Sequence, residues 1–282
     1  MNLRRRSSLA LAAILALYAP AAVVRAQEAA ATQAVPSARE IVDRFAQVTH
    51  AKEVLAKHTS MRVRGRFQME AMQMTGSMEA WSARPDKRLT SIEMGAFGKL
   101  VQGYDGKVGW MTQPMMGARV LDGAELLQFK LEADFEAVLK NSDAYESTRT
   151  LGIETFEEKP CYKVEVVAKP LADMDAAKSR EVRTTHEFYD VESGLLLGTK
   201  GYQEGEMSSG PYSTVSSDYK DFGGQLMASK STIKSSGQEF EILIDSVEYD
   251  TATDALFALP KEVQDVLASR AVKAAPAPPK PQ

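Results

Sequence analysis

Cysteine is nearly absent from this chain of 282 residues, which limits how the fold can be stabilised. Cys161 is the only cysteine, so an intramolecular disulfide is impossible and the fold must depend on its hydrophobic core. A lone thiol in an exported protein can be reactive. The residues that follow it, among them Tyr162, Val164 and Val166, favour a buried structural cysteine instead.

Histidine is also scarce, which argues against a metal site. None of the three histidines has metal-ligand spacing with another: His50 and His58 flank the end of a predicted helix, and His186 stands alone in a predicted strand. The chain lacks a phosphate-binding glycine loop, a nucleophile elbow and an HExxH motif. Carboxylate pairs such as Glu157-Glu158 fall in predicted turns, where solvated charge is the simpler interpretation. We therefore expect no catalytic residue, no metal, no cofactor and no enzymatic activity.

Long apolar runs are missing beyond the N-terminus. Residues 1–26 combine three consecutive arginines, an apolar run over 9–22 and a small-residue cleavage motif, which together are typical of a secretory signal peptide. We expect cleavage near Ala26 and a periplasmic protein. No later segment approaches the ~20 apolar residues of a spanning helix, so we expect no membrane span. Because no cysteine stands at the cleavage point, we also expect no lipid anchor.

The charge balance and the composition of the two ends limit partners and domains. Residues 1–26 carry four arginines and no acidic residue, so their removal changes the formal net charge from −4 to −8. Nucleic acid is not an expected partner, because phosphate binding requires clustered Lys and Arg. We expect a flexible linker at 27–36, one folded domain at 37–268 and a disordered Pro/Ala-rich tail at 269–282.

Hydrophobic periodicity predicts two amphipathic helices. The first covers residues 37–57 and begins at Ser37, which is a good N-cap. The second covers residues 122–139, with apolar residues at mixed three- and four-residue spacing and Asp122 as a candidate cap. Each helix needs an apolar surface to pack against.

The remaining folded sequence alternates with the period of two that is typical of strands. Over residues 62–69, Arg and Gln alternate with apolar residues and glycine, which indicates a strand solvated on one side. Turn signals such as Asp105-Gly106 separate further strands, which we expect between 62 and 113 and between 150 and 249. The expected fold class is mainly β (α+β): a curled antiparallel sheet of about eleven strands forming an incomplete β-barrel, covered by the N-terminal helix and a middle lid helix.

Methionine is unusually frequent, with 13 in the chain. Met69, Met72 and Met74 form an MxxMxM pattern, and closely spaced thioethers in an exported protein can bind Cu(I). Flexible methionines also fill irregular cores, or line hydrophobic cavities that accept varied ligands. The sequence leaves core and cavity open, and no Cys or His stands nearby to strengthen a copper site.

Three short motifs resemble a known family by their order and spacing. They are GSMEAWSARP at 76–85, GYDGKVGWMTQP at 103–114 and ALFALP at 255–260, after a signal peptide, a helix and a strand. This arrangement resembles the LolA/LolB outer-membrane lipoprotein carrier superfamily (outer membrane lipoprotein-sorting proteins) over most of 37–265. In that family an incomplete barrel with helices over its mouth holds the acyl chains of a lipoprotein in the periplasm.

The resemblance implies a carrier or binder of lipid or lipoprotein acyl chains, with membrane-bound donor and acceptor proteins as possible partners. Arg84 matches the family's arginine before proline, which holds the helical lid closed until cargo enters; a plain strand-end surface arginine is the alternative. The family also contains regulators that bind an envelope protein, so the same groove has a second candidate use. The chain is longer than the usual soluble carrier, chiefly in loops near 171–181 and 205–217. The candidate ligand-binding residues are Phe67, Met69, Met78, Trp81, Arg84, Trp110, Leu126 and Phe129.

Overall fold

The computed structural model describes residues 35–135, 144–205 and 209–274. The predicted signal peptide at 1–26 and most of the predicted linker lie outside these residues, so both stay predictions. Within the described residues no helix is both long enough and apolar enough to cross a membrane.

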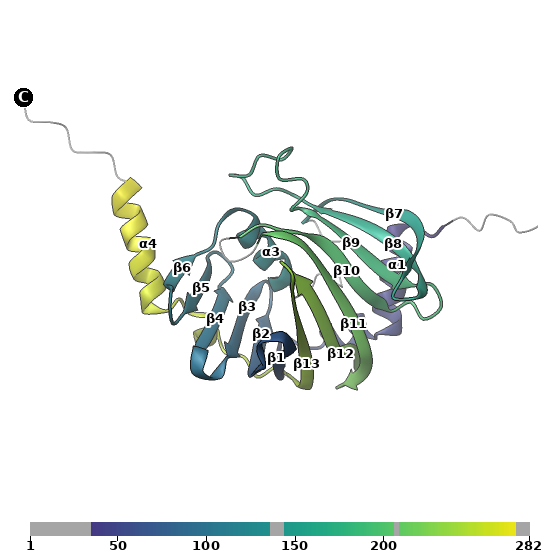
Figure 1. Ribbon diagram of the computed structural model, residues 1–282, viewed down its shortest axis with the longest axis horizontal. Helices are drawn as coiled ribbons and strands as arrows, with labels where there is room; N and C mark the ends of the chain where they lie inside the picture. Colours follow the sequence, from purple (N-terminus) through teal and green to yellow (C-terminus); the bar gives the residue numbers. More distant parts are fainter. Residues whose placement is uncertain (1–34, 136–143, 206–208, 275–282) are drawn as a thin grey trace, which may run out of the picture. The chain divides into compact units, whose positions relative to one another are not determined.

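Thirteen antiparallel strands form one continuous curved sheet (Figure 1). The strands are β1 (Ser60–Met69), β2 (Met74–Ala83), β3 (Lys87–Glu93), β4 (Lys99–Tyr104), β5 (Gly109–Gln113), β6 (Gly117–Val120), β7 (Tyr145–Phe156), β8 (Lys159–Ala168), β9 (Thr184–Asp190), β10 (Leu196–Gln203), β11 (Gly210–Phe222), β12 (Gln225–Ser235) and β13 (Gln238–Tyr249). Their spatial order is β6-β5-β4-β3-β2-β1-β13-β12-β11-β10-β9-β8-β7. The first and last strands are therefore neighbours in the middle, and β6 and β7 are the two unpaired edges of an open sheet.

The strand prediction is correct in type and wrong in number. The structure has thirteen strands instead of about eleven. The sequence predicts no element where the structure has β6. This strand has four residues and lies between the Pro114-Met115-Met116 turn and α3 (Gly123–Ala133). Four residues are too few for a period of two to be recognised, so β6 depends on its pairing with β5.

Within the described residues, four α-helices and three short 3₁₀ turns lie before, between and after the strands. The helices are α1 (Ala38–Val48), α2 (Ala51–Leu55), α3 (Gly123–Ala133) and α4 (Lys261–Ala274), and the 3₁₀ turns are η1 (Glu70–Met72), η2 (Gly95–Phe97) and η3 (Asp254–Phe257). α1 begins with a capping box, in which the backbone N–H of Glu40 donates to Ser37 Oγ at 3.3 Å and the backbone N–H of Ser37 donates to Glu40 Oε2 at 2.8 Å.

The predicted first helix over 37–57 is two helices. The chain breaks at His50, whose φ of 55° is left-handed, and α2 continues from Ala51. Thr49 explains the break in part, because its carbonyl accepts a hydrogen bond from Leu226 N of β12 at 3.0 Å. The Thr49 carbonyl thus accepts a hydrogen bond from the sheet, whereas in a continuous helix it would accept one from the next turn.

The predicted lid helix over 122–139 is shorter within the described residues. α3 ends at Ala133, Asp134 is extended, and Phe135 N donates to Pro85 O at 3.3 Å. Residues 136–139 of this prediction lie outside the described residues. The contact with Pro85 ties the end of α3 to the turn between β2 and β3.

The predicted disordered tail is wrong for its first residues. α4 runs to Ala274 and crosses the expected boundary at 268, and only 275–282 lie outside the described residues. Val263 is fully buried, and Arg270 Nη2 donates to the carbonyl of Val120 in β6 at 3.2 Å. The prediction rested on the Pro and Ala content of this segment. Its prolines begin only at Pro276, so the residues before them can form a helix, which packs on β6.

Strand register divides the sheet into two faces, because directly paired residues project to the same side. We call the face that carries Val63, Phe67 and Met69 of β1 the inner face, and the opposite one the outer face. Both α1 and α3 pack on the inner face. Ile41 of α1 lies against Val164, Val166 and Tyr189, and Phe129 of α3 lies against Tyr104, Met111 and Leu121. In Figure 1, α1 accompanies the β7–β10 end and α3 lies between the two ends of the curved sheet.

The outer face of the central strands carries ion pairs. Arg62 binds Glu79, Arg64 binds Glu248 at 3.0 Å, and Arg66 binds Asp245 at 3.0 Å. The alternation of Arg with apolar residues in β1 thus leaves its charges on the solvated side, as the sequence predicts.

Asp250 connects the start of β1 to the end of β13. Its carboxylate accepts hydrogen bonds from Thr59 N at 2.7 Å and contacts His58 Nδ1 at 2.7 Å, while its own N–H donates to Ser60 O at 3.0 Å. The hydrogen bond with His58, followed by that from Thr59, lowers the pKa of Asp250 from 3.8 to about 2.

We predict that Asp250 contributes to acid sensitivity. Because its pKa is lower in the folded protein than in the unfolded chain, its contribution to stability is complete above pH ~4 and is lost as pH falls toward 2. Asp250→Asn should lower the urea midpoint at pH 7 and lose less further stability between pH 4 and 2 than the wild type. Asp245→Asn, which retains Asp250, should show the wild-type acid response. Identical pH profiles for Asp250→Asn and the wild type would contradict this role.

Candidate functional site

The inner face of the central strands is a continuous apolar surface. Phe67, Met69 and Met78 are buried there, with Phe67 opposite Gly76 and Met78 opposite Gly65. β13 extends the surface, since Ile242 pairs with Phe67 and the Phe67 and Phe240 rings lie 5.8 Å apart. We call this surface the apolar wall; its residues are Phe67, Met69, Met78, Phe240, Ile242 and Ile244. Three of the predicted site residues therefore lie together.

Leu126 and Phe129 reach the same face from α3. Phe129 is buried with Tyr104, Met111 and Ala133, and Leu126 packs at the edge of this cluster. The two residues thus attach α3 to β4 and β5, beside the apolar wall. Both residues lie on the inner face and their direct contacts are with the sheet; their role in a lid stays a prediction.

Trp81 and Trp110 lie on the other face of the sheet, which corrects their assignment to the cavity. Trp81 pairs with Arg62, whose guanidinium carbon is 4.5 Å from the centre of the Trp81 ring. Trp110 pairs with Gly103 and is 2% exposed. A Cβ on Gly103 would come within 2.4 Å of the indole, so the ring lies directly over this glycine. The pleat separates both tryptophans from Phe67 and Met78.

Arg84 connects the two helical segments to the end of β2. Its Nη2 donates to the carbonyl oxygen of Leu55, the last residue of α2, at 2.8 Å, and its Nε donates to that of His58, between α2 and β1, at 3.0 Å. Its guanidinium carbon is 5.6 Å from the ring centre of Phe135, which follows α3. A half-buried arginine with carbonyl and aromatic partners differs from the solvated strand-end arginine of the alternative interpretation.

The inner face changes character beyond β12. Thr199 of β10 and Thr214 of β11 are paired with their hydroxyl oxygens 2.8 Å apart, and Thr199 is opposite Glu187 of β9. Tyr189 donates to Glu187 Oε2 at 2.8 Å. Burial raises the pKa of Glu187 and raises that of Tyr189 well above its usual value. The sequence analysis missed this polar region, although Ser and Thr recur at two-residue intervals in β11 and β12.

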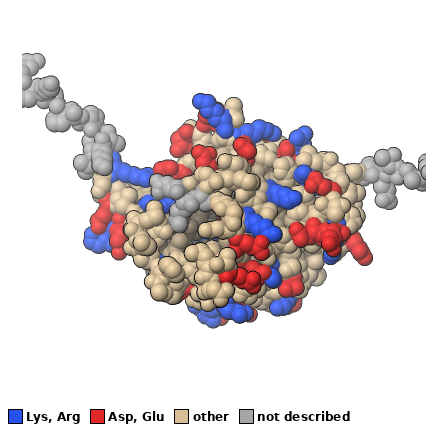
Figure 2. Space-filling view, viewed as in Figure 1, with Lys and Arg blue, Asp and Glu red and all other residues tan. Residues whose placement is uncertain are grey.

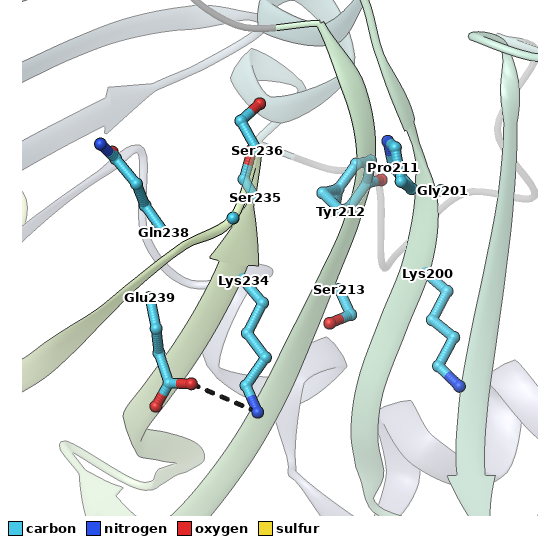
Figure 3. A pocket seen from close by; sticks show the side chains of 11 residues that line it. Lys200, Gly201, Pro211, Tyr212, Ser213, Lys234, Ser235, Ser236, Gln238 and Glu239 are labelled. Carbon is cyan, nitrogen blue, oxygen red and sulfur yellow. Dashed lines mark ion pairs between the residues drawn. The ribbon is translucent and has the colours of Figure 1, made fainter.

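A pocket of about 480 Å³ lies at the ends of β10, β11 and β12 (Figure 3). Lys200, Ser213 and Lys234 are consecutive cross-strand partners along one side of it, and Lys234 pairs with Glu239 at 3.2 Å. The side chain of Tyr212 is directed toward Gly201. A smaller pocket of about 250 Å³ lies between α1 and β8–β9. Neither pocket was predicted.

The space-filling view shows a hollow with uncharged residues on one side and Lys, Arg, Asp and Glu side chains on the other (Figure 2). Part of the apolar wall is not enclosed in a core. Phe240, Ile242 and Ile244 are indeed only half-buried.

Some methionines lie on the inner face of the sheet, and others lie in exposed turns. Met69 and Met74 are direct partners on the inner face, whereas Met72 lies in η1 and is 54% exposed. Met115 and Met116 in the β5–β6 turn are 92% and 61% exposed. Of the three sulfurs in the MxxMxM pattern, one is therefore at a solvated turn. The described residues contain no group of three or more His, Cys, Asp or Glu placed to hold a metal ion.

Cys161 is a structural residue, as predicted. It is fully buried in a cluster with Phe156, Phe188 and Leu197, and the two phenylalanine rings stack at 4.3 Å. Burial raises the pKa of its thiol, which disfavours the reactive thiolate.

Comparison with known proteins identifies the fold. No sequence model of a protein family matches the chain, and no curated protein matches it in sequence. A LolA superfamily protein from Nitrosomonas europaea superposes with a TM-score of 0.54 at 10% identity, over 80% of this chain and 99% of that one. A DUF1329 family protein from Desulfovibrio piger superposes with a TM-score of 0.51 at 15% identity, over 77% and 97%. The protein therefore has a LolA-like fold, as the sequence resemblance implied.

The position of the tryptophans gives a stability prediction. Trp110→Ala should lower the free energy of unfolding by ~3–5 kcal/mol, because a buried aromatic ring leaves a cavity. Trp81→Ala should cost only about 1 kcal/mol, since Trp81 is partly exposed and its contact with Arg62 is a cation–π interaction at the surface. Urea unfolding at pH 7 compares the two variants. Equal losses would contradict the assignment of Trp110 to the core.

Proposed function

We propose that this protein is a periplasmic carrier or binder of lipid or lipoprotein acyl chains, acting in outer-membrane lipoprotein sorting or a related lipid transport. The observation that carries the proposal is the apolar wall on the inner face of an unclosed sheet. The LolA-like fold supports it. An open sheet with a buried apolar face and helices packed on that face is suited to a ligand that enters between helix and sheet.

The energetics of acyl chains favour such a container. Transfer of one chain of about fifteen methylenes out of water is worth ~12 kcal/mol at ~0.8 kcal/mol per methylene, so unassisted passage through an aqueous compartment is negligible. A carrier must also release its cargo. Unbranched methionines such as Met69 and Met78 adapt to chains of varied shape and do not demand one fit.

Arg84 is the residue we propose as the latch, meaning the contact that holds the helices against the inner face when no cargo is bound. Its hydrogen bonds to the carbonyls of Leu55 and His58, and its contact with Phe135, connect α2 and the end of α3 to β2. Entry of cargo under the helices would have to break these contacts. When the cargo leaves, the Arg84 contacts form again, and their free energy offsets part of the free energy of cargo binding.

The first test of the proposal is cargo binding. Protein purified from periplasm should carry copurified lipid in native mass spectrometry and lipid extraction, and the emptied protein should take up a fluorescent acyl probe. Met78→Gln should weaken probe binding about tenfold or more, because it buries an amide that lacks a partner. Ser77→Gln is the matched control, since Ser77 is exposed on the outer face of the same strand.

An empty protein that takes up no acyl probe would contradict the proposal. If it also captured one specific envelope protein, the regulatory alternative would replace it. Equal probe binding by Met78→Gln and Ser77→Gln would contradict an acyl-chain site on the apolar wall.

The second test concerns the latch. Arg84→Leu should remain folded and bind the acyl probe more tightly, with slower release to acceptor vesicles, because the empty closed form loses its polar contacts and the equilibrium shifts to the loaded form. Arg64→Leu removes an arginine on the outer face and should release as the wild type does. Release rates by stopped-flow fluorescence and thermal midpoints check both points. Unchanged release by a folded Arg84→Leu would refute the latch.

A further inference from the structure

The inner face of β9–β12 carries hydroxyl groups where the central strands carry apolar side chains. Register connects the two regions, since Ile242 of the apolar wall pairs with Ser231, and Ser231 pairs with Ser216. In the next row Thr214 pairs with both Ile233 and Thr199. We call this second region the hydroxyl wall; its residues are Thr185, Thr199, Tyr212, Thr214, Ser216 and Ser231.

Solvation alone does not explain the hydroxyl wall. The outer face of the same strands also meets solvent and carries His186, Lys200 and Lys234. Over residues 185–187, 199–203, 212–216 and 231–235 of the inner face, Glu187 is the one side chain that is a carboxylate or an amine. A face that is merely wet has no reason to avoid lysine and glutamate, so the two faces are specialised differently.

The hydroxyl wall keeps hydrogen-bonding capacity for a ligand. The Thr199 and Thr214 hydroxyls are 2.8 Å apart, and the Thr185 and Tyr212 hydroxyls are 3.4 Å apart. Each hydroxyl has one donor and two acceptor sites, so a mutual hydrogen bond leaves each pair one donor and further lone pairs. In the first pair, Thr214 Oγ1 also accepts a hydrogen bond from Thr199 N at 3.1 Å, which occupies one of these lone pairs. All four side chains are half-buried, which leaves them within reach of a bound molecule.

Glu187 and Tyr212 add to the same chemistry. Glu187 accepts a hydrogen bond from Tyr189 at 2.8 Å beside the hydroxyl wall, and burial raises the pKa of its carboxyl. The Tyr212 ring lies against Gly201, where a Cβ would come within 2.8 Å of it (Figure 3). An aromatic ring beside uncharged hydroxyls offers an apolar face and polar groups together.

We propose that the inner face binds an amphipathic lipid whose acyl chain lies on the apolar wall and whose uncharged, polyhydroxylated headgroup lies on the hydroxyl wall. The proposal rests on the acyl-chain function above and names the class of headgroup. A sugar or polyol headgroup fits because its hydroxyls exchange hydrogen bonds with Thr, Ser and Tyr. A phosphate headgroup would find no Lys or Arg side chain on this wall to balance its charge.

The test compares two headgroups on the same acyl chains. Glucosyl-diacylglycerol and phosphatidylglycerol compete with the fluorescent acyl probe for the emptied wild-type protein, for the double variant Thr199→Val, Thr214→Val, and for Thr232→Val. The double variant replaces a hydroxyl pair with methyl groups of nearly the same shape, but it also removes the Thr214 Oγ1 acceptor of Thr199 N, so its thermal midpoint and its acyl-probe affinity check that it is folded. Thr232→Val is the matched control, because Thr232 lies on the outer face of β12 opposite Val215.

The wild type and Thr232→Val should bind the glucosyl lipid about tenfold more tightly than phosphatidylglycerol, and the double variant should lose that preference while it binds the acyl probe normally. Equal affinity of the wild type for both lipids overturns this proposal and leaves the acyl-chain function standing. A double variant that keeps the preference also overturns it. If neither lipid nor probe binds, both proposals fail.

Discussion

The pairing of the first strand with the last is the constraint on which the rest of the structure depends. β1 and β13 lie side by side in the middle of the sheet, so hairpins added before and after them extend in opposite directions. The two halves of the chain therefore share one inner face. The same pairing places β6 and β7 at opposite edges, where they leave the sheet open. Contacts of Asp250 with His58 and Thr59 hold this junction at one end. A closed barrel would bury the inner face completely, whereas this topology leaves room for helices on that face.

Strand alternation then assigns a different role to each side of the sheet. In β1 the arginines reach acidic partners on the outer face, while Phe67 and Met69 face inward. Across β9–β12 the outer face still carries charged residues such as Lys200 and Lys234, but the inner face carries mainly hydroxyls. Helices α1 and α3 cover separate parts of the inner face and form separate small cores with it. The apolar wall and the hydroxyl wall lie between them. Arg84 contributes from the rim, where its contacts reach the ends of both helical segments.

Features set by neighbours in sequence were predictable, and those set by neighbours in space were not. The alternation in β1, the buried Cys161 and the α1 cap follow from local patterns. The break at His50 depends on Leu226, far away in sequence, and β6 and α4 depend on packing against each other. Trp81 shows a different limit. Side chains alternate along a strand, so the spacing of Met78 and Trp81 in the sequence already places them on opposite faces. The candidate site taken from the family resemblance nevertheless contained both residues. The hydroxyl wall needed the register of four strands, which no single strand reveals.

The open sheet also has a consequence for solubility. An unpaired strand exposes backbone donors and acceptors that another chain can join, so long flat edges promote aggregation. β6 offers only four residues for such pairing. β7 is twelve residues long, but its register shifts near Tyr145 and at Thr150–Gly152, and it carries the charged side chains of Glu146, Arg149 and Glu154. Irregular backbone and charge thus protect the longer edge, and brevity protects the shorter one. The sheet can therefore stay open at both edges without a second sheet joining it.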